Sequence, residues 1–493
     1  MSEHVAPLIV VLPLATAYSI LLFCPKYWRY AQRASLICTG LLVVLTCILA
    51  MQVNVRGSVI YHFGNWSPPW GIEFLIDRIS AFFLVMVSAI SFVVILFANG
   101  LLYKEIKERV LGQYYALFLI LLASLLGIAS SNDLFNVFVF LEISSVSAAA
   151  LVAVNGNKLA LEASVKYLVL STLGSGSLLL AIANIYMVTG YLNLTFIAEA
   201  LPQAYALYPL NVLATLGLFV VGLTVKSALY PMHIWLPDAH GSAPTSSSAV
   251  LSALVVKVYI IVFLKLIFRV FTLEFVSQVP LQFVLLLMSA LAILLGSLLA
   301  IRQTDIKKML AYSTVAQIGY IFLGVGLLTY NGLLGAVLHI LNHAIMKAML
   351  FLSAGLLIKL TGKRDIRSLA GVGRIYPLPM IAFSLGSLAM VGIPPLNGFI
   401  SKWYLSLGAL EAGLPIYVLV ILVSSFLNGL YYLPIVISAF FGQSTEPTYK
   451  PLPIPIGASI ALICLCIATI FFGLFSGIPT QYLDPALENW FQL

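Results

Sequence analysis

Charged residues are scarce in this chain. Asp, Glu, Lys and Arg together make up 9% of its 493 residues, whereas a soluble domain carries about 25%. Hydrophobic residues make up 62%, and the mean hydropathy is +1.08. This combination excludes a soluble globular enzyme, a disordered chain and a fibrous repeat. It predicts an integral membrane protein that is all-α and crosses the membrane many times.

Cysteine is also scarce, and the sequence motifs that mark metal, phosphate-binding and catalytic sites are missing. The cysteines lie in apolar runs without a CxxC pair, so we expect no iron–sulfur or zinc site, no other bound metal and no disulfide framework. A phosphate-binding glycine loop, a nucleophile elbow and an HExxH motif are missing too, which leaves no candidate catalytic or cofactor-binding residue. No stretch interleaves basic and aromatic residues as nucleic-acid-binding proteins do, so no nucleic-acid partner is expected. The five cysteines are Cys24, Cys38, Cys47, Cys464 and Cys466.

Fourteen apolar runs are long enough to cross the roughly 30 Å hydrocarbon core of a bilayer. The segment 57–77 is too rich in Pro, Gly and Trp to do so, and we expect an extended interfacial loop there, for which a hairpin is one candidate form. The expected spans are residues 6–24, 34–53, 79–103, 111–130, 134–154, 163–189, 210–235, 247–268, 281–301, 309–329, 333–358, 376–408, 415–441 and 453–477.

Two of these spans contain helix-breaking sequences. The seventh meets Pro231 and Pro237, and the twelfth contains GIPPLNGFISKW, residues 392–403. Irregular backbone inside a bilayer is tolerated only where protein or a water-filled cavity covers it. Two interrupted helices in matching positions are typical of inverted-repeat transporters, and simple proline kinks are the alternative. We therefore expect two inverted five-helix repeats, helices 4–8 and 9–13, with helices 7 and 12 broken.

This pattern divides the chain into four parts. The first holds helices 1–3 with the interfacial loop 54–78, the next two are the repeats, and the last holds helix 14 and a tail. The boundaries are residues 1–110, 111–270, 271–442 and 443–493.

Basic residues set the expected orientation. Loops after odd-numbered helices carry nearly all of them, and the opposite loops hold only Arg56, Arg78 and Arg269. The positive-inside rule then places both termini on the non-cytoplasmic side of the cell membrane. The basic residues on the cytoplasmic side are Lys26, Arg29, Arg33, Lys104, Lys107, Arg109, Lys158, Arg302, Lys307, Lys308, Lys363, Arg364, Arg367, Arg374 and Lys450.

Five charged residues remain inside the spans, and they bear most directly on function. They are Glu142, Lys226, Lys257, Lys347 and Lys402. A charge at mid-membrane costs roughly 2.5–3.5 kcal/mol on insertion scales. Five of them cost on the order of 10 kcal/mol, which is comparable to the net stability of a domain. Groups this costly face one another or a wet cavity, and they indicate an ion path.

The chemistry of these groups fits proton transfer. Burial lowers the pKa of a lysine and a nearby carboxylate raises it, so moving the carboxylate switches the lysine between holding and releasing a proton. We expect Glu142 and Lys226 to form such a switch. The other lysines, with histidine relays, would be stations of a lateral proton wire. His339, His343 and Lys347 recur every four residues, so they share one helix face.

Structural alternatives exist for these residues. Glu142 would then be a fixed ion pair or a carboxylate satisfied by serines, and Lys226 and Lys257 would reach the interface with extended side chains. Lys265, near the end of its span, is expected to extend to the interface in this way.

Other ionisable residues lie near the first break. Lys166 follows Glu162 by one helical turn, which predicts a local ion pair. His233 and His240 flank the break, and they are either gates or ordinary loop residues. Asp238 lies close enough in sequence to His240 to set its charge.

The motifs around these residues resemble those of the antiporter-like proton-pumping subunits. This family is shared by respiratory complex I, Mrp-type Na+/H+ antiporters (their D-type subunit) and membrane-bound energy-converting hydrogenase and sulfane reductase complexes. The resemblance covers helices 4 to 13 and implies fourteen helices, two inverted five-helix repeats and broken helices 7 and 12. It rests on KSALYPMHIWLPDAHGSAPTSSSAVLSALVVKVYIIVFLK, IRQTDIKKMLAYSTVAQIGYI, HILNHAIMKAMLFLSAG and GIPPLNGFISKW.

The resemblance also assigns roles to residues. The family's glutamate on helix 5 matches Glu142, and its lysines on helices 7, 8 and 11 match Lys226, Lys257 and Lys347. Its station on helix 12 matches Lys402. That station is a glutamate in one complex I paralogue, so the lysine here is more similar to the D-type Mrp subunits and to the hydrogenase subunits.

The implied function is translocation of protons, or exchange of Na+ for H+, within a multisubunit membrane complex. The implied partners are paralogous and small membrane subunits, soluble iron–sulfur redox subunits and lipid, with no cofactor on this chain itself. The chain would thus serve an oxidoreductase complex without carrying its redox centre. A quinone-binding subunit of a membrane oxidoreductase, a stand-alone cation/proton antiporter and a scaffold that has lost pumping remain alternatives.

Overall fold

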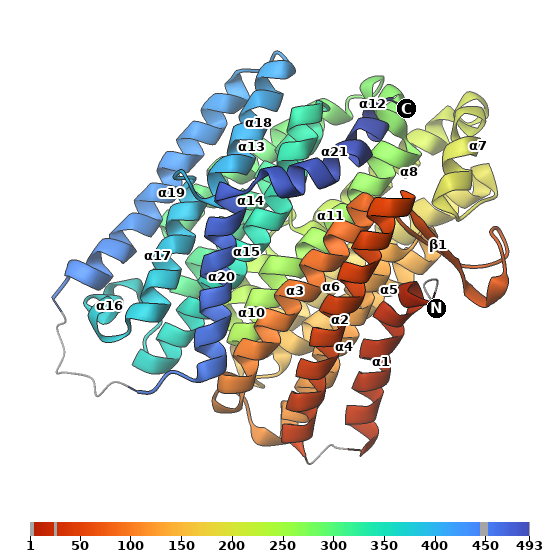
Figure 1. Ribbon diagram of the computed structural model, residues 1–493. Helices are drawn as coiled ribbons and strands as arrows, with labels where there is room; N and C mark the ends of the chain where they lie inside the picture. Colours follow the sequence, from red (N-terminus) through yellow and green to blue (C-terminus); the bar gives the residue numbers. More distant parts are fainter. Residues whose placement is uncertain (1–3, 24–26, 444–451, 493) are drawn as a thin grey trace.

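The computed structural model describes residues 4–23, 27–443 and 452–492, and most of these residues are helical (Figure 1). Thirteen helices of the described part are long and apolar enough to cross a membrane. The expectation of a multi-pass, all-α membrane protein is therefore confirmed, apart from one short hairpin. The expectations for Cys24, Lys26 and Lys450 concern residues that lie outside the described ranges.

The N-terminal part holds three long helices and the hairpin. The strands pair antiparallel with Val59 opposite Ile76, so segment 57–77 forms the hairpin that was one of its expected forms. Its elements are α1 (Val5–Phe23), α2 (Trp28–Arg56), β1 (Val59–His62), η1 (Phe63–Asn65), β2 (Glu73–Ile76), α3 (Arg78–Leu101) and η2 (Leu102–Lys104).

The longest helix of the middle part that the sequence did not predict lies between the expected spans 163–189 and 210–235. This is α7 (Leu194–Leu207), whose first turn is capped by the Asn193 side chain and which is too short to cross a bilayer. The other elements are α4 (Glu108–Ser130), α5 (Leu134–Ala153), α6 (Lys158–Thr189), α8 (Pro209–Ser227), α9 (Trp235–Ser242), α10 (Thr245–Val250), η3 (Leu251–Val255), α11 (Val256–Lys265), η4 (Leu266–Val270) and α12 (Thr272–Ser277).

The C-terminal part ends in a further helix where only a tail was expected. This helix, α21 (Gly477–Gln492), crosses the ends of α3 and α15 (Figure 1). The others are α13 (Leu281–Ile301), α14 (Ile306–Gly326), α15 (Tyr330–Thr361), η5 (Ile366–Leu369), α16 (Val372–Ile375), α17 (Pro377–Val391), α18 (Asn397–Glu411), α19 (Ile416–Phe441) and α20 (Ile456–Leu474).

Both expected helix breaks are present. α8 ends at Ser227 and α9 begins at Trp235, while α17 ends at Val391 and α18 begins at Asn397. Gly392 ends α17 with a φ of 91°, a conformation that glycine adopts without the penalty a Cβ brings. The expected span 376–408 is therefore divided into α17 and α18, each of 15 residues.

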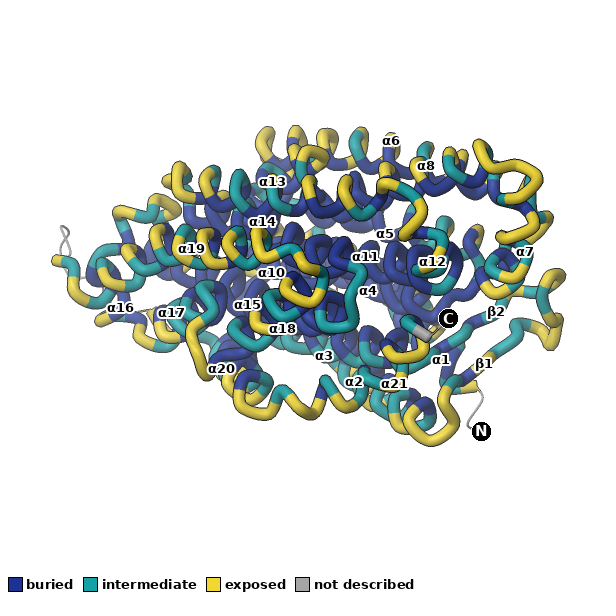
Figure 2. Tube along the Cα trace, turned by 90° about the horizontal axis from the view of Figure 1, so that it is seen from above, coloured by how far each residue is buried: buried dark blue, intermediate teal, exposed yellow. Residues whose placement is uncertain are grey.

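The molecule is elongated when it is seen along the helices (Figure 2). α6 and α8 lie along one long edge, α2 and α20 lie along the other, and α4, α11, α14 and α15 fill the middle. The continuous helix from Thr245 to Val270 is buried over its whole most apolar stretch, and α14 and α15 are nearly as buried. Lys257 and Lys347 lie on these central helices, and Lys226 and Lys402 lie on helices that flank the breaks. Glu142 lies on α5, which packs against the central helix α4.

Both ends of the described chain lie at the hairpin end of the bundle. The His4 ring meets the Tyr61 ring of β1 edge to face, with centroids 5.9 Å apart. Near the other terminus, the Tyr482 hydroxyl donates a hydrogen bond to the Ala50 carbonyl close to the end of α2. Segments near the two ends of the described chain thus contact the hairpin and the adjoining end of α2.

Candidate functional site

Glu142 of α5 and Lys226 of α8 form an ion pair, with Lys226 Nζ 3.1 Å from Glu142 Oε1. Lys226 Nζ also donates to Ser145 Oγ at 2.7 Å and to Ser171 Oγ at 2.9 Å. Ser175 Oγ donates to the same carboxylate oxygen of Glu142. The first break ends α8 directly after Lys226, and the ammonium group lies among three helices in place of extending to an interface.

The two partners differ in exposure. The Lys226 side chain is 1% exposed, whereas the Glu142 side chain is 36% exposed. Glu142 therefore lies at the edge of the bundle beside α6, and Lys226 lies behind it. The expected ion pair is present, together with the serine contacts that were its alternative.

Lys257 lies in the fully buried central helix. The turn before it, η3, is a wide π-helical turn, and the Ser252 carbonyl of that turn accepts a hydrogen bond from Lys257 Nζ. Such wide turns occur often at functional sites. Two residues later, Tyr259 shares a hydrogen bond of 2.8 Å with Ser144, the neighbour of Ser145 in the Lys226 site.

His240 of α9 is buried between the Lys226 site and α15. Its ring centroid is 6.2 Å from that of Trp235 and 5.9 Å from that of Phe351. The Trp235 indole donates to the carbonyl of Val225, next to Lys226, and Lys347 Nζ lies 6.0 Å from the Phe351 ring centre. Neither ring nitrogen of His240 has a hydrogen-bond partner among the described residues.

Asp238 does not pair with His240, although their closeness in sequence made that pairing a possibility. Its carboxylate pairs with Lys166 at 3.2 Å and with Lys308 at 3.5 Å, on the outer face of the break. Lys166 also pairs with Glu162 at 3.1 Å, so the predicted local pair is present. These charges form a surface cluster that joins α6, α9 and α14.

α15 carries three of the expected stations. The rings of His339 and His343 are stacked with centroids 5.7 Å apart, so the expected shared face is present. His339 is held by Ser401 at 2.8 Å and by Gln317 at 2.9 Å, whereas both ring nitrogens of His343 lack a partner in the described part of the chain. Lys347 Nζ donates to the Leu310 carbonyl at 2.8 Å.

Lys402 lies at the second break. Its Nζ donates to the carbonyls of Met390 and Val391 at 2.9 and 3.0 Å and to Ser425 Oγ at 2.9 Å. The last carbonyls of a helix have no intrahelical partner, so the lysine satisfies groups that the break leaves free. Nζ also lies 5.1 Å from the Tyr320 ring centre, a cation–π distance.

Two further lysines are buried, and the prediction was wrong for both. Lys265 was expected to extend to the interface, but it is 2% exposed and donates to the Ala129 carbonyl at 2.7 Å. Lys307 was assigned to a loop. It lies in the first turn of α14, is 5% exposed and donates to the Ala243 carbonyl at 2.9 Å. Each of these lysines donates to a carbonyl at the end of another helix. The charges that neighbour each lysine in the sequence do not reveal the position of that carbonyl.

The structure thus gathers six buried lysines but no buried Asp or Glu among the described residues. Among the described residues, the partly exposed Glu142 is the single carboxylate that forms an ion pair with one of these six lysines, namely Lys226. Hydroxyl groups and backbone carbonyls, not acids, contact the remaining ammonium groups. Sequence reasoning found the charged members and named serines only as alternative partners of Glu142. It did not predict the hydroxyls that contact the other lysines, such as Ser313 at Lys347 and Ser425 at Lys402.

Comparison with known proteins agrees with this arrangement. Residues 131–428 match the family described as NADH:quinone oxidoreductase/Mrp antiporter, transmembrane. The N-type subunit of the NADH-quinone oxidoreductase of Desulforudis audaxviator is 36% identical over 491 residues, covering 97% of each chain. The D-type subunit of the Na(+)/H(+) antiporter of Alkalihalophilus pseudofirmus is 30% identical over 487 residues, again covering 97% of each chain.

Solved structures are similar over almost the whole chain. A chain of the membrane-bound sulfane sulfur reductase, an archaeal respiratory membrane complex, superimposes with a TM-score of 0.89 at 32% identity and covers 99% of this chain and 97% of its own. A chain of the Mrp complex from Dietzia sp. gives a TM-score of 0.89 at 25% identity with the same coverage. The expected family is confirmed. This protein belongs to the NADH:quinone oxidoreductase/Mrp antiporter transmembrane family, as an antiporter-like subunit of the kind that works in multisubunit membrane complexes.

Proposed function

We propose that this chain transfers protons along its row of buried ionisable groups, from Glu142 and Lys226 past Lys257 and Lys347 to Lys402. The observation that carries the proposal is the Glu142–Lys226 ion pair, which lies at one end of this row of lysines. His240, His339 and His343 lie beside the row and serve as relays or gates.

The pairing pattern explains how the row would respond to a signal. A carboxylate near a lysine favours the protonated ammonium form, and withdrawal of that carboxylate favours proton release. Within the row, only Lys226 has a carboxylate at hydrogen-bonding distance among the described residues. A change in the charge or position of Glu142 would therefore release a proton from Lys226 first, and the neighbouring lysines would respond to that change in charge.

We further infer the setting of this activity. The chain would lie in the cell membrane with both termini on the non-cytoplasmic side, and residues 111–270 and 271–442 would be its inverted repeats. Its partners would be paralogous and small membrane subunits. Soluble iron–sulfur subunits would join them if the coupled event is redox chemistry, and Na+ would be the counter-ion if it is ion exchange.

The decisive test removes Lys226. The intact complex carrying Lys226→Ala would be reconstituted in vesicles, and proton movement would be followed with a pH-sensitive dye. We expect pumping to be abolished while the complex keeps its full set of subunits. Lys359→Ala is the matched control, because Lys359 is an exposed lysine of α15, and it should pump normally. Normal pumping by Lys226→Ala would overturn the proposed path.

A second experiment identifies the coupled event. The complex would be purified through a tag on this chain, and the masses of its subunits and its metal content would be measured together. Iron alongside soluble redox subunits supports a respiratory-type pump. A metal-free set of membrane subunits, with transport that responds to Na+, supports cation/proton exchange.

A further inference from the structure

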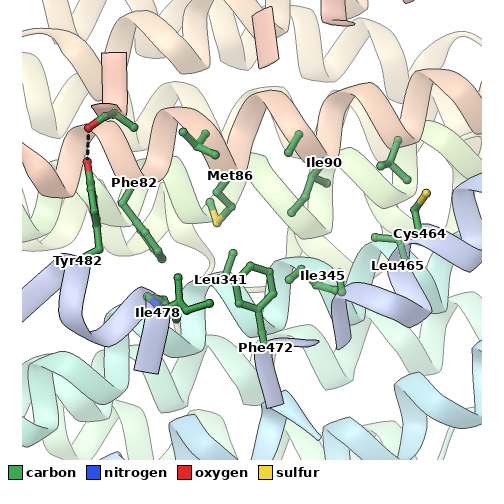
Figure 3. A pocket seen from close by; sticks show the side chains of 16 residues that line it. Phe82, Met86, Ile90, Leu341, Ile345, Cys464, Leu465, Phe472, Ile478 and Tyr482 are labelled. Carbon is green, nitrogen blue, oxygen red and sulfur yellow. Dashed lines mark hydrogen bonds between the residues drawn. The ribbon is translucent and has the colours of Figure 1, made fainter. Parts of the chain in front are cut away.

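An apolar cavity of about 350 Å³ lies beside α3, between α2 and α20. Figure 3 shows Phe82, Met86 and Ile90 of α3 along one side, with Leu341 and Ile345 of α15 and Phe472 of α20 opposite. The volume lies within the roughly 300–1,000 Å³ range of ligand pockets. We call this cavity the α3 groove.

The packing of α3 explains why the groove exists. At one end α20 lies very close to α3, since a Cβ on Gly457 would lie 2.6 Å from the Leu96 carbonyl oxygen. On the other side, Thr46 of α2 is fixed to Ser88 of α3 by a hydrogen bond of 2.7 Å. α2 and α20 therefore flank α3 without filling the space between them, and the groove remains open there.

The lining restricts what can occupy the groove. Its side chains are apolar except for the Tyr482 hydroxyl and the Cys464 thiol, and the hydroxyl is already bonded to the Ala50 carbonyl at 3.3 Å (Figure 3). Water needs two to four polar partners to be held in a cavity. The groove therefore suits a hydrocarbon chain, and it offers little to the polar oxygens of a quinone ring.

A cation lies at one end of the same helix face. Arg78 begins α3, and Phe82 follows it by one turn, so the arginine and the apolar stripe share a side. Asp77 beside it pairs with Arg269 at 3.7 Å. The Arg78 guanidinium instead contacts Tyr482, lying 5.8 Å from its ring centre and 3.5 Å from its carbonyl oxygen.

We propose that the α3 groove binds one acyl chain of an anionic membrane phospholipid, whose phosphate is recognised by Arg78. The arrangement matches such a lipid in both halves: an apolar slot within the membrane and an arginine at its end, where the headgroup lies. The bound chain would also support α15, because Leu341 and Ile345 lie two residues before and after His343. This inference does not depend on the proton path.

Photo-crosslinking of the unmodified protein is the first test. The full chain would be placed in phosphatidylcholine vesicles that contain a small share of phosphatidylglycerol with a diazirine in its acyl chain. We expect adducts on peptides from α3 and α20. Adducts confined to other exposed helices would overturn the proposal.

Variants then test the two halves of the site. Ala89→Trp fills the groove, whereas Val44→Trp places the same side chain on the exposed face of α2 (Val44 is 56% exposed). Native mass spectrometry after detergent exchange should show one retained phosphatidylglycerol in the wild type and in Val44→Trp, and none in Ala89→Trp. Arg78→Gln should lower the preference for phosphatidylglycerol over phosphatidylcholine about fivefold.

Several outcomes would contradict the inference. Equal lipid retention in the wild type and in Ala89→Trp would show that the lipid binds elsewhere. An unchanged headgroup preference in Arg78→Gln would remove the role of the arginine. Retention of an isoprenoid quinone in place of phospholipid would replace the proposed ligand.

Discussion

Lys226 Nζ lies 3.1 Å from Glu142 Oε1, although the lysine side chain is 1% exposed and the carboxylate is 36% exposed. The more accessible partner of the pair is thus the acid. A charge placed outside the bundle beside α5 and α6 would act on Glu142 directly, and it would reach Lys226 only through that carboxylate. On the proposed proton path, this asymmetry would make Glu142 the group that receives a signal and Lys226 the group that responds.

The first prediction concerns Glu142. Glu142→Gln keeps the side-chain length and can still accept from Ser175, but it removes the negative charge that pairs with Lys226. We expect proton pumping to fall at least about tenfold, which corresponds to about 1.4 kcal/mol. Glu142→Asp keeps the charge at a longer distance and should lose less. Pumping would be measured with the reconstituted complex.

A double variant shows whether the two residues act as one unit. If they do, Glu142→Gln combined with Lys226→Gln should be no worse than Lys226→Gln alone, because effects of coupled groups are not additive. Wild-type pumping in Glu142→Gln would mean that the ion pair is structural only.

The second prediction concerns Lys402 and stability. Lys402→Met leaves the Val391 carbonyl without its donor, while the Met390 carbonyl keeps a hydrogen bond of 3.2 Å from Asn428. An unsatisfied buried group costs about 1–3 kcal/mol, so thermal unfolding should occur at a lower temperature. Lys402→Glu should be worse, because a carboxylate would then face two carbonyl oxygens.

Lys158→Met is the control for this measurement, since Lys158 is an exposed lysine at the start of α6 and its loss should leave the unfolding temperature unchanged. If Lys402→Met unfolds at the wild-type temperature, the hydrogen bonds from Lys402 to the carbonyls at the end of α17 do not stabilise the fold.

The fold was largely predictable because long apolar runs mark the spans and prolines mark the breaks. Both breaks lie where the prolines placed them. α7 and α21 were missed because their apolar residues form one stripe on a short helix, which a search for continuous runs overlooks. Their formation depends on docking against neighbouring helices, α21 against α3 and α15.

The sequence was enough to predict most of the charged residues of the site, but it was not enough to predict which groups they contact. A mid-span lysine such as Lys257 can be recognised from the sequence as a candidate functional residue, because a charge inside the membrane is energetically costly and usually marks a functional site. Lys307 and Lys265 were misjudged because burial at a helix end depends on whether a distant segment offers a free carbonyl. Lys265, for example, binds Ala129 and Ser131 at the end of α4. No spacing rule within one helix contains that information.

The third prediction compares two histidines one turn apart on α15. His339 is bonded to Ser401 and Gln317, so His339→Ala should lower stability by about 1–3 kcal/mol by leaving partners unpaired. His343→Ala breaks no hydrogen bond to a described residue and should cost less stability. The ring nitrogens of His343 are available to exchange protons. The ratio of pumping loss to stability loss should therefore be larger for His343→Ala than for His339→Ala. Equal ratios of pumping loss to stability loss in both variants would contradict this assignment.

The last prediction concerns pH and Asp133, which lies between α4 and α5 outside the spans. Its Oδ1 caps α5 by accepting from the Asn136 backbone N–H at 2.8 Å, and burial raises the pKa of its carboxyl above the ordinary value. The folded state therefore holds this proton more tightly than the unfolded state, so this group adds stability as the pH falls through its raised pKa.

Asp133→Asn tests this dependence because it keeps the cap and lacks the titrating group. Its unfolding temperature at neutral pH should equal or exceed that of the wild type, and the gain from Asp133 on acidification should disappear. Asp305→Asn at the cap of α14 is the contrasting control, because it loses an ion pair to Arg364 of 2.8 Å and should be destabilised at neutral pH. A fall in stability for Asp133→Asn as large as that for Asp305→Asn would show that the Asp133 charge is stabilising.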